Sequence, residues 1–153
     1  MSQIVFLIGF MGAGKSRMGK RLAKRMNYAF LDSDQEIEKE NNSTVDQLFT
    51  ELGEVGFRKL ETKWLTDLDA ENTIVALGGG TPCFNDNMEL ILYKGISIYL
   101  ELTPKMLVDR LQRAKGIRPL IEPFKNDRVV LQQFVENKLK ERALFYNQAN
   151  YTT

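Results

Sequence analysis

The sequence predicts a single three-layer α/β domain in which a parallel β-sheet carries helices on both faces. Short runs rich in β-branched and aromatic residues alternate with segments of helical periodicity along the chain. The first run, Ile4 to Ile8, is continuously apolar, as in a central parallel strand that is buried on both sides. The chain has 153 residues, of which 43% are hydrophobic, and this size suits one domain with a substantial core.

The predicted elements follow one another without repeats, linkers or low-complexity segments. We expect strands at 4–8, 28–31, 73–77 and 96–100, and helices at 16–26, 45–49, 54–71, 88–92, from 104 onward and at 129–146. Thr44 and Gln47 have the spacing of a capping box, and Gly53 separates two helices. Pro104 occupies the favoured first position of its helix. Residues 114–128 are predicted to form a loop. In such sheets, ligands bind at the carboxyl ends of the strands.

The composition excludes several classes of protein. Because the chain has no histidine, it has no Ser-His or Cys-His nucleophile, no imidazole base and no His-ligated zinc site. The single cysteine, Cys83, cannot form an internal disulfide and fits a reducing cytoplasm. Since the net charge is only +1, we expect no nucleic-acid partner. The apolar run at 4–8 is too short to cross a membrane and has no basic segment before it, so we expect neither a membrane anchor nor a signal peptide.

Residues Gly9 to Ser16 match the pattern G-x-x-x-x-G-K-S between a predicted strand and a predicted helix. Glycines let such a loop turn its N–H groups inward, and the following helix adds the positive end of its dipole. In this pattern Lys15 neutralises phosphate charge, and the Ser16 hydroxyl can bind Mg²⁺. The alternative is a chance glycine-rich turn, which the strand and helix on either side disfavour. The motif predicts binding of a nucleoside triphosphate without specifying the reaction.

Two carboxylates follow the second predicted strand. Asp32 and Asp34 are two residues apart, so in an extended segment they face the same way. We expect Asp32 to act near the magnesium ion, through water, with Glu101 after the fourth strand as the alternative. Asp34 is expected to hold, and to deprotonate, an acceptor hydroxyl. The structural alternative is a polar turn that begins the next helix.

Three further features are candidates for substrate binding. Arg58 and Glu61 have the spacing of one helix face, so Glu61 can orient the guanidinium toward a substrate carboxylate; ordinary surface pairs have the same spacing. Gly78–Gly80 suits either a close approach of a ligand to the main chain or a plain tight turn. Residues 115–121 suit either a lid that brings Arg118 onto the transferring phosphoryl group or a solvated loop.

Taken in order, these motifs resemble those of shikimate kinases over essentially the whole chain. The matching segments are Gly12–Ser16, Asp32–Asp34, Phe57–Glu61, Leu77–Gly80, Arg118–Leu120 and Glu141–Arg142, followed by Tyr146 and Ala149. The first motif occurs in many nucleotide-binding proteins, whereas the ordered set is specific. The resemblance implies a P-loop kinase fold with sheet order 2-3-1-4-5. It also implies one domain over 1–153, with substrate-binding helices at about 33–61 and a lid at about 113–127.

The resemblance further implies a reaction and its residues. ATP would phosphorylate the 3-hydroxyl of shikimate in aromatic amino-acid (chorismate) biosynthesis, with Mg²⁺ as cofactor and the protein as a monomer. ATP would be bound by Gly12, Ala13, Gly14, Lys15, Ser16, Arg17 and Arg118, and the metal by Ser16 and Asp32. Shikimate would contact Asp34, Arg58, Gly79, Gly80 and Arg142, between walls formed by Phe49, Phe57, Pro119 and Leu120. The catalytic residues would be Lys15, Asp34 and Arg118. By its own pattern, Arg142 is only one charge on an amphipathic helix.

The sequence departs from the family pattern in two places. In the family a lid-region arginine stacks on adenine; Arg113 is the nearest candidate, at a shorter spacing from Arg118. The family also continues into a fifth strand, an adenine-contacting loop and a final helix, whereas this chain ends at Thr153. We therefore expect the fifth strand to be missing, leaving an open sheet edge, weaker ATP binding and lower stability than in a longer enzyme.

Two other functions remain open. Another small-molecule kinase, such as a gluconate kinase, would share the phosphate loop, but it has no obvious need for two carboxylate-binding arginines beside a triple glycine. A non-catalytic nucleotide-binding module is the second. The short C-terminus favours it mildly, whereas intact Lys15, Ser16 and both aspartates disfavour it.

Overall fold

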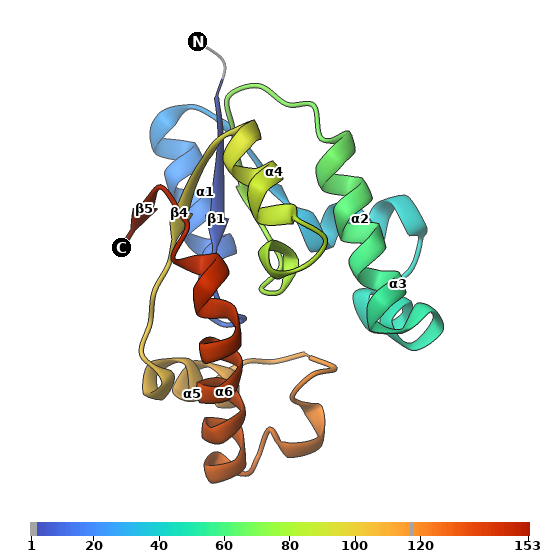
Figure 1. The fold of residues 1–153 in the computed structure, drawn as a ribbon, viewed down its shortest axis with the longest axis vertical. Coiled ribbons are helices and arrows are strands. Elements are labelled where there is room, and N and C mark those ends of the chain that lie inside the picture. The colour runs from blue at the N-terminus through green and yellow to red at the C-terminus, as the bar shows by residue number, and fades with distance from the viewer. Residues whose placement is uncertain (1–2, 117) are drawn as a thin grey trace.

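The computed structural model of the chain describes residues 3–116 and 118–153 and contains a five-stranded parallel sheet flanked by helices (Figure 1). The strands are β1 (Ile4–Ile8), β2 (Ala29–Asp32), β3 (Thr73–Ala76), β4 (Ile96–Tyr99) and β5 (Tyr151–Thr152). Their order is β2-β3-β1-β4-β5, and each neighbouring pair is parallel. The predicted fold class and strand order are confirmed.

With one exception, the helices lie where the periodicity predicts them, with differences at their ends. They are α1 (Lys15–Met26), α2 (Ser33–Asn41), α3 (Val45–Asp67), α4 (Asn87–Lys94), α5 (Pro104–Arg113) and α6 (Arg128–Tyr146), with the 3₁₀ turns η1 (Thr81–Cys83) and η2 (Glu122–Phe124). The exception is α2, which has only Ser33 and Ile37 buried, so it carries no apolar stripe, and the resemblance alone implies it. The α3 helix joins two predicted helices across a kink at Gly53, whose φ of 69° is rarely adopted by other residues. The predicted capping box of Thr44 and Gln47 begins it. It ends at Asp67 rather than at the predicted Glu71.

Alternating side chains of β1 divide the core into two layers. Ile4, Phe6 and Ile8 pack in one cluster with side chains of α3, α4 and α6. Val5 and Leu7 pack in the other cluster with side chains of α1, α5 and α6. All residues of β1 are buried, as in a central strand that is covered by helices on both faces.

The expectation that the fifth strand is missing is wrong. After α6, the Asn150 side-chain oxygen accepts hydrogen bonds from the Ser97 backbone N–H at 2.8 Å and the Ser97 hydroxyl at 3.1 Å. These bonds hold the chain against β4, where Tyr151–Thr152 pairs in parallel with Ile98–Tyr99. A strand of two exposed residues has no apolar run or alternation that sequence analysis can detect. The β4 strand is therefore not an open edge.

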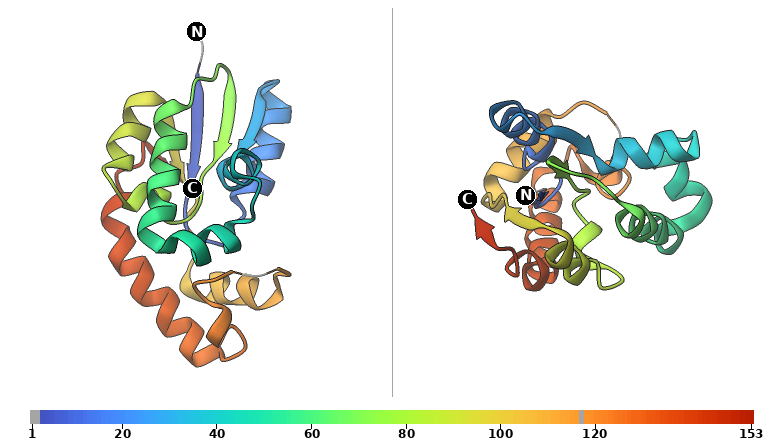
Figure 2. Two further views of the ribbon diagram at one scale, coloured as in Figure 1. Left: turned by 90° about the vertical axis from the view of Figure 1, so that its right-hand side faces the viewer. Right: turned by 90° about the horizontal axis from the view of Figure 1, so that it is seen from above.

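Two groups of elements extend beyond the sheet and frame the region where its strands end. Figures 1 and 2 show α2 and α3 projecting to one side, and α5 with the start of α6 at the end of the molecule away from the N-terminus. The predicted lid, about 113–127, joins α5 to α6, and its residue Ile117 lies outside the described residues. In the described part of the chain, no helix combines the length and the apolar character needed to cross a membrane.

Candidate active site

The loop between β1 and α1 carries the phosphate-binding motif in the predicted context. Gly12 and Gly14 have φ angles of 81° and 91°, in the left-handed region that favours glycine. Gly14 caps α1, whose first residue is Lys15. The loop therefore leads directly into a helix N-terminus, where backbone N–H groups and the helix dipole attract phosphate. Ala13 faces the core instead, and its N–H donates to the Phe10 carbonyl at 3.1 Å.

Lys15 is buried against its own loop. Its ammonium group donates hydrogen bonds to the carbonyl oxygens of Gly9 at 2.6 Å and Phe10 at 2.9 Å. Burial, opposed by the negative charge of Asp34, lowers the pKa of Lys15 from 10.5 to about 8. The side chain is therefore mainly charged at neutral pH, as a phosphate ligand requires.

The two residues predicted to bind the metal, Ser16 and Asp32, lie together. Ser16 Oγ donates to Asp32 Oδ2 at 2.5 Å, and Asp32 Oδ1 caps α2 by accepting from the Gln35 N–H at 3.2 Å. Mg²⁺ prefers oxygen ligands and often takes one or two from the protein together with phosphate oxygens. No group of three or more His, Cys, Asp or Glu side chains that could hold a metal occurs among the described residues. The pair therefore fits Mg²⁺ in combination with a bound triphosphate.

Asp34, in the first turn of α2, has a perturbed carboxyl group. Burial, together with the negative charges of Glu61 and Asp32, raises the pKa of Asp34 from 3.8 to about 7. The positive charge of Lys15 opposes this shift. A carboxylate that titrates near neutral pH is suited to accept a proton from a hydroxyl group.

A cavity of about 610 Å³ lies over the phosphate loop. Most of the predicted nucleotide and metal residues line it, namely Gly12, Gly14, Lys15, Ser16, Arg17, Asp32 and Arg118. Arg110 and Arg113 of α5 also line it. A Cβ on Gly14 would lie only 3.1 Å from Arg110 Nη1. Nothing in the sequence distinguishes Arg110, because it is one of several charges on α5 and only the fold brings it to the loop.

A second cavity, of about 280 Å³, contains the predicted acceptor residues. It is lined by Asp34, Arg58, Gly79, Gly80 and Arg142, and by the predicted wall residues Phe49, Phe57, Pro119 and Leu120. Arg58 and Arg142 are 5% and 4% exposed. Within the described part of the chain, Arg58 Nε and Arg142 Nη1 have no hydrogen-bond partner. Two buried guanidinium groups with unpaired donors suit an acceptor that carries a carboxylate.

The two cavities meet. The residues that line both are Met11, Asp34, Gly78, Gly79 and Arg118. The Asp34 carboxylate and the Arg118 guanidinium therefore lie where a ligand of one cavity would face a ligand of the other. This geometry suits direct transfer of a phosphoryl group, because such transfer depends mainly on alignment and on compensation of charge.

The triple glycine after β3 packs against side chains of the site. A Cβ on Gly78 would lie 3.0 Å from Asp34 Oδ1 and from Glu61 Oε2. A Cβ on Gly80 would lie 2.5 Å from Arg58 Nη2. Larger residues at these positions would displace the acidic and basic groups that line the cavity, which gives the glycines a structural reason beyond a tight turn.

Tyr146, at the end of α6, fixes the same glycine turn. Its hydroxyl donates to the Gly79 carbonyl at 2.5 Å, and its ring lies against Tyr99 with centroids 5.0 Å apart. The side chain is fully buried, and burial raises the pKa of Tyr146 well above its usual value. In the sequence, Tyr146 is only one of the matching positions that follow the Glu141–Arg142 motif, so its contact with the Gly79 carbonyl comes from the structure.

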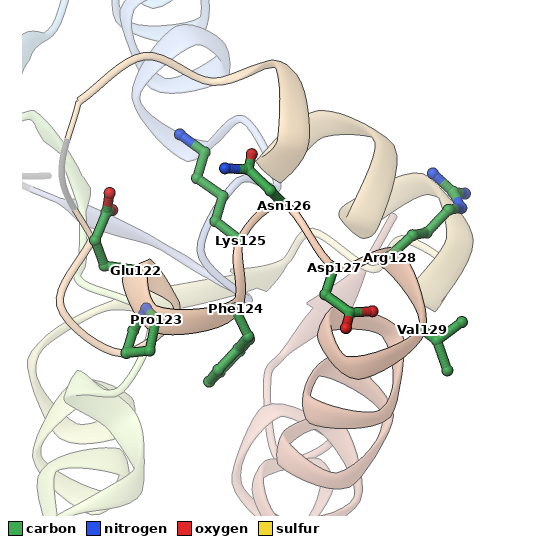
Figure 3. A pocket seen from close by; sticks show the side chains of 8 residues that line it. All are labelled: Glu122, Pro123, Phe124, Lys125, Asn126, Asp127, Arg128 and Val129. Atoms are coloured by element: carbon green, nitrogen blue, oxygen red, sulfur yellow. The ribbon is translucent and has the colours of Figure 1, made fainter.

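The predicted lid is tied down at its base. Lys125 Nζ donates to the Ala114 carbonyl at 2.7 Å, and Arg128 pairs with Asp109 at 2.8 Å. Figure 3 shows Lys125 and Arg128 among the side chains that line an open hollow of about 550 Å³ at residues 122–129. None of the predicted site residues lines this hollow, so we assign it no part in substrate binding.

The fold and the two adjoining cavities define the class of protein. A phosphate loop beside a small acceptor cavity, on a parallel sheet of this order, is typical of small-molecule kinases of the P-loop type, in which a nucleoside triphosphate and a small acceptor lie side by side. Comparison with known families then gives the particular one: the model of the shikimate kinase family matches residues 11–153, and the chain belongs to this family.

Known relatives agree with this assignment over nearly the whole chain. Shikimate kinase from Bacteroides fragilis is 43% identical, over 96% of this chain and 82% of that protein. The crystal structure of shikimate kinase from Bacteroides thetaiotaomicron has a TM-score of 0.93 and 41% identity, covering 99% of this chain and 86% of that one. Shikimate kinase from Acinetobacter baumannii in complex with shikimate has a TM-score of 0.91 and 35% identity, covering 100% and 83%.

Proposed function

We propose that this protein catalyses the ATP-dependent phosphorylation of shikimate at its 3-hydroxyl group, giving shikimate 3-phosphate and ADP in aromatic amino-acid (chorismate) biosynthesis. The chain belongs to the shikimate kinase family, and a relative of the same fold binds shikimate. One observation in this chain carries the proposal. The cavity over the phosphate loop meets the cavity that holds two buried arginines, and Asp34 and Arg118 lie at the junction.

The nucleotide is assigned to the larger cavity. Its phosphates are held by Gly12, Ala13, Gly14, Lys15, Ser16, Arg17 and Arg118, with Ala13 acting through the shape of the loop. Kinases of this family are ATP-dependent and generally use Mg²⁺. Ser16 and Asp32 would hold this ion, which supplies positive charge to the phosphates when it is bound. Arg110 and Arg113 place two cations at the α5 side of the cavity, and Arg113 is the candidate residue for stacking on the adenine ring.

The acceptor is assigned to the smaller cavity. Arg58 and Arg142 bind the shikimate carboxylate, and Gly79 and Gly80 contact the ring substituents through the main chain. Asp34 accepts hydrogen bonds from the hydroxyl groups. Because hydrogen-bond donors of two buried guanidinium groups are costly to leave without an acceptor, this cavity selects a hydroxylated acid over a neutral sugar.

In the reaction, Asp34 orients the 3-hydroxyl and takes its proton as the new O–P bond forms, a role that suits a pKa of about 7. Lys15 and Arg118 compensate the negative charge that spreads over the transferring phosphoryl group. We assign Arg118 to a lid at about 113–127, whose closure excludes water that would hydrolyse ATP. The helices at about 33–61 carry Asp34 and Arg58.

An assay of ADP release, with ATP and Mg²⁺ and with or without shikimate, tests the proposal. We expect ADP release that depends on shikimate and that gluconate does not support. Turnover with gluconate in place of shikimate would indicate the other small-molecule kinase. ATP binding without turnover on either acceptor would indicate a non-catalytic nucleotide-binding module.

We also propose that the protein acts as a cytoplasmic monomer without a nucleic-acid partner. Residues of a single chain line both cavities, which is consistent with activity as a monomer. Gel filtration combined with light scattering should give a mass near 17.6 kDa, whereas a mass of twice that value would contradict the monomer.

A further inference from the structure

The Arg58 guanidinium is held by two carboxylates and by an aromatic ring. Nη1 donates to Glu61 Oε1 at 2.8 Å, and Nη2 lies 3.4 Å from Glu54 Oε1. The central carbon of the guanidinium lies 4.4 Å from the centroid of the Phe84 ring. This distance is well within the range of a cation–π interaction, and such interactions strengthen when the cation is removed from water, as Arg58 is.

Phe84 differs from the other phenylalanines near this arginine. The rings of Phe49 and Phe57 are more distant, at 5.6 Å and 5.8 Å, and both line the acceptor cavity. Phe84 is not among the described residues that line it. Phe84 follows η1 in the chain and therefore contacts the arginine from a separate element, outside the space that a substrate would fill.

We propose that Phe84 is a positioning residue for acceptor binding, which holds the Arg58 guanidinium by the face of its ring and so leaves the N–H groups directed to the acceptor carboxylate. The inference rests on the proposed function, because it takes shikimate as the acceptor. A ring attracts a cation without using any of its hydrogen-bond donors. A carboxylate such as Glu61 uses one or more of the five donors of an arginine.

The donors of Arg58 support this assignment. Glu61 and Glu54 each accept from one terminal nitrogen, whereas Nε has no partner in the part of the chain that the structure describes. Each terminal nitrogen of an arginine carries two N–H groups, so one N–H on Nη1 and one on Nη2 are used by neither glutamate and are left for an acceptor carboxylate. The ring of Phe84 holds the cation while leaving them available.

The η1 turn restrains both members of the buried ion pair. Its first residue, Thr81, donates a hydrogen bond from its hydroxyl to Glu61 Oε2. Phe84, directly after the turn, contacts Arg58. The same short segment thus contacts the Glu61 carboxylate through Thr81 and the Arg58 guanidinium through Phe84. It begins directly after the triple glycine of the acceptor cavity.

Calorimetric titration of shikimate into the wild type, Phe84→Leu and Phe84→Tyr tests the inference. We expect Phe84→Leu to raise the Kd for shikimate about 10-fold, because the cation–π contact is lost from a desolvated arginine. Phe84→Tyr retains a ring and should stay within about 2-fold of the wild type. The matched control is Phe145→Leu, since Phe145 is a partly buried core residue over which no cation lies among the described residues. It should leave the Kd unchanged.

Methyl shikimate separates positioning from a general structural role, because it lacks the charged carboxylate. Positioning predicts that Phe84→Leu and the wild type bind methyl shikimate equally, whereas a structural defect would weaken both ligands alike and overturn the inference. If Phe84→Leu does not fold, phenylalanines with one, two or three ring fluorines at position 84 replace it. Their shikimate Kd should rise with each fluorine, because fluorine weakens the ring face, and a constant Kd would overturn the inference.

These outcomes are separate from the proposed function. Wild-type protein that binds shikimate but releases no ADP would contradict the proposed function alone. Equal shikimate Kd values for the wild type and Phe84→Leu would contradict the role of Phe84 alone. Wild-type protein that does not bind shikimate would contradict both.

Discussion

The nucleotide cavity and the acceptor cavity are built from the chain in different ways. The phosphate-binding part of the first comes mainly from one stretch, Gly9–Ser16, whose spacing is sufficient to predict it. The acceptor cavity draws residues from α2, from α3, from the glycine turn after β3, from residues 118–120 after α5, and from α6. A local motif carries its own geometry, whereas a site gathered from distant segments exists only after the fold has brought them together.

The two cavities also hold charge differently. The cation of the phosphate loop is Lys15, whose pKa burial lowers to about 8. The cations of the acceptor cavity are arginines, which keep their charge when buried. We therefore expect substitutions in the two cavities to affect different kinetic constants, with Asp34 and Arg118 at the junction affecting turnover itself.

The largest effect is expected from Asp34→Asn, at the junction. Loss of the proton acceptor should lower kcat by about 10³-fold while both substrates still bind, which steady-state kinetics would measure.

The same substitution should change the stability of the fold. The folded state holds the Asp34 proton up to a pH of about 7, so ionisation of this group lowers the free energy of unfolding as pH rises from 3.8 through 7. Asp34→Asn should therefore have a higher Tm than the wild type above pH of about 7. A lower Tm together with normal turnover would remove Asp34 from this role.

Arg118→Ala, also at the junction, should lower turnover by roughly 10²–10³-fold even when ATP and shikimate are saturating. The loss arises because one positive charge is missing where negative charge develops. Rapid-quench measurement of the chemical step would check it. Turnover near that of the wild type at saturating ATP would exclude Arg118 from the reaction.

Arg58→Ala tests the acceptor cavity by itself. Loss of one buried partner of the carboxylate should raise the KM for shikimate about 50-fold, with a smaller change in kcat and no change in the KM for ATP. Initial rates at varied concentrations of each substrate would separate these constants. If the KM for shikimate is unchanged, Arg58 does not bind the acceptor.

Tyr146→Phe should have a smaller effect on the same cavity. Loss of the hydroxyl that donates to the Gly79 carbonyl frees the glycine turn and should raise the KM for shikimate about 5-fold. The matched control is Tyr93→Phe, because Tyr93 is 88% exposed and lies on α4. Equal KM values for the two variants would show that the hydrogen bond to Gly79 does not matter for binding.

The pH dependence should be the mildest effect. The value of kcat/KM for ATP reports groups of the protein before ATP binds. It should fall below a pH of about 7, as Asp34 gains its proton, and above a pH of about 8, as Lys15 loses its own. The acid limb should disappear in Asp34→Asn, and its persistence there would assign it to another group.

Much of the fold was predictable because β1 and the phosphate loop have strong local patterns. The β5 strand was not, because Tyr151–Thr152 is held by Asn150 and by the edge of β4 rather than by an apolar pattern of its own. Ala13 fits the loop motif by position, yet its side chain is buried in the core and its N–H donates to the Phe10 carbonyl within the loop. Only some N–H groups of a tight loop can point toward a bound phosphate, and the motif alone does not say which.

The acceptor cavity was predictable only in part. The spacing of Arg58 and Glu61 gave the pair, but an exposed pair would have the same spacing, and only packing distinguishes the two. Only the family resemblance assigns Arg142 to the acceptor, since nothing in its own helix pattern separates it from a surface charge. Arg110, Tyr146 and Phe84 act across the fold, so their contacts lie beyond any local pattern.

The central claim is that the two cavities form one chamber in which Asp34 lies between nucleotide and acceptor. A crystal structure with a non-hydrolysable ATP analogue, Mg²⁺ and shikimate tests it most directly. The claim predicts the shikimate 3-hydroxyl within hydrogen-bond distance of the Asp34 carboxylate and facing the γ-phosphate beside Arg118. Shikimate bound away from Asp34, or a triphosphate that does not reach the junction, would contradict it.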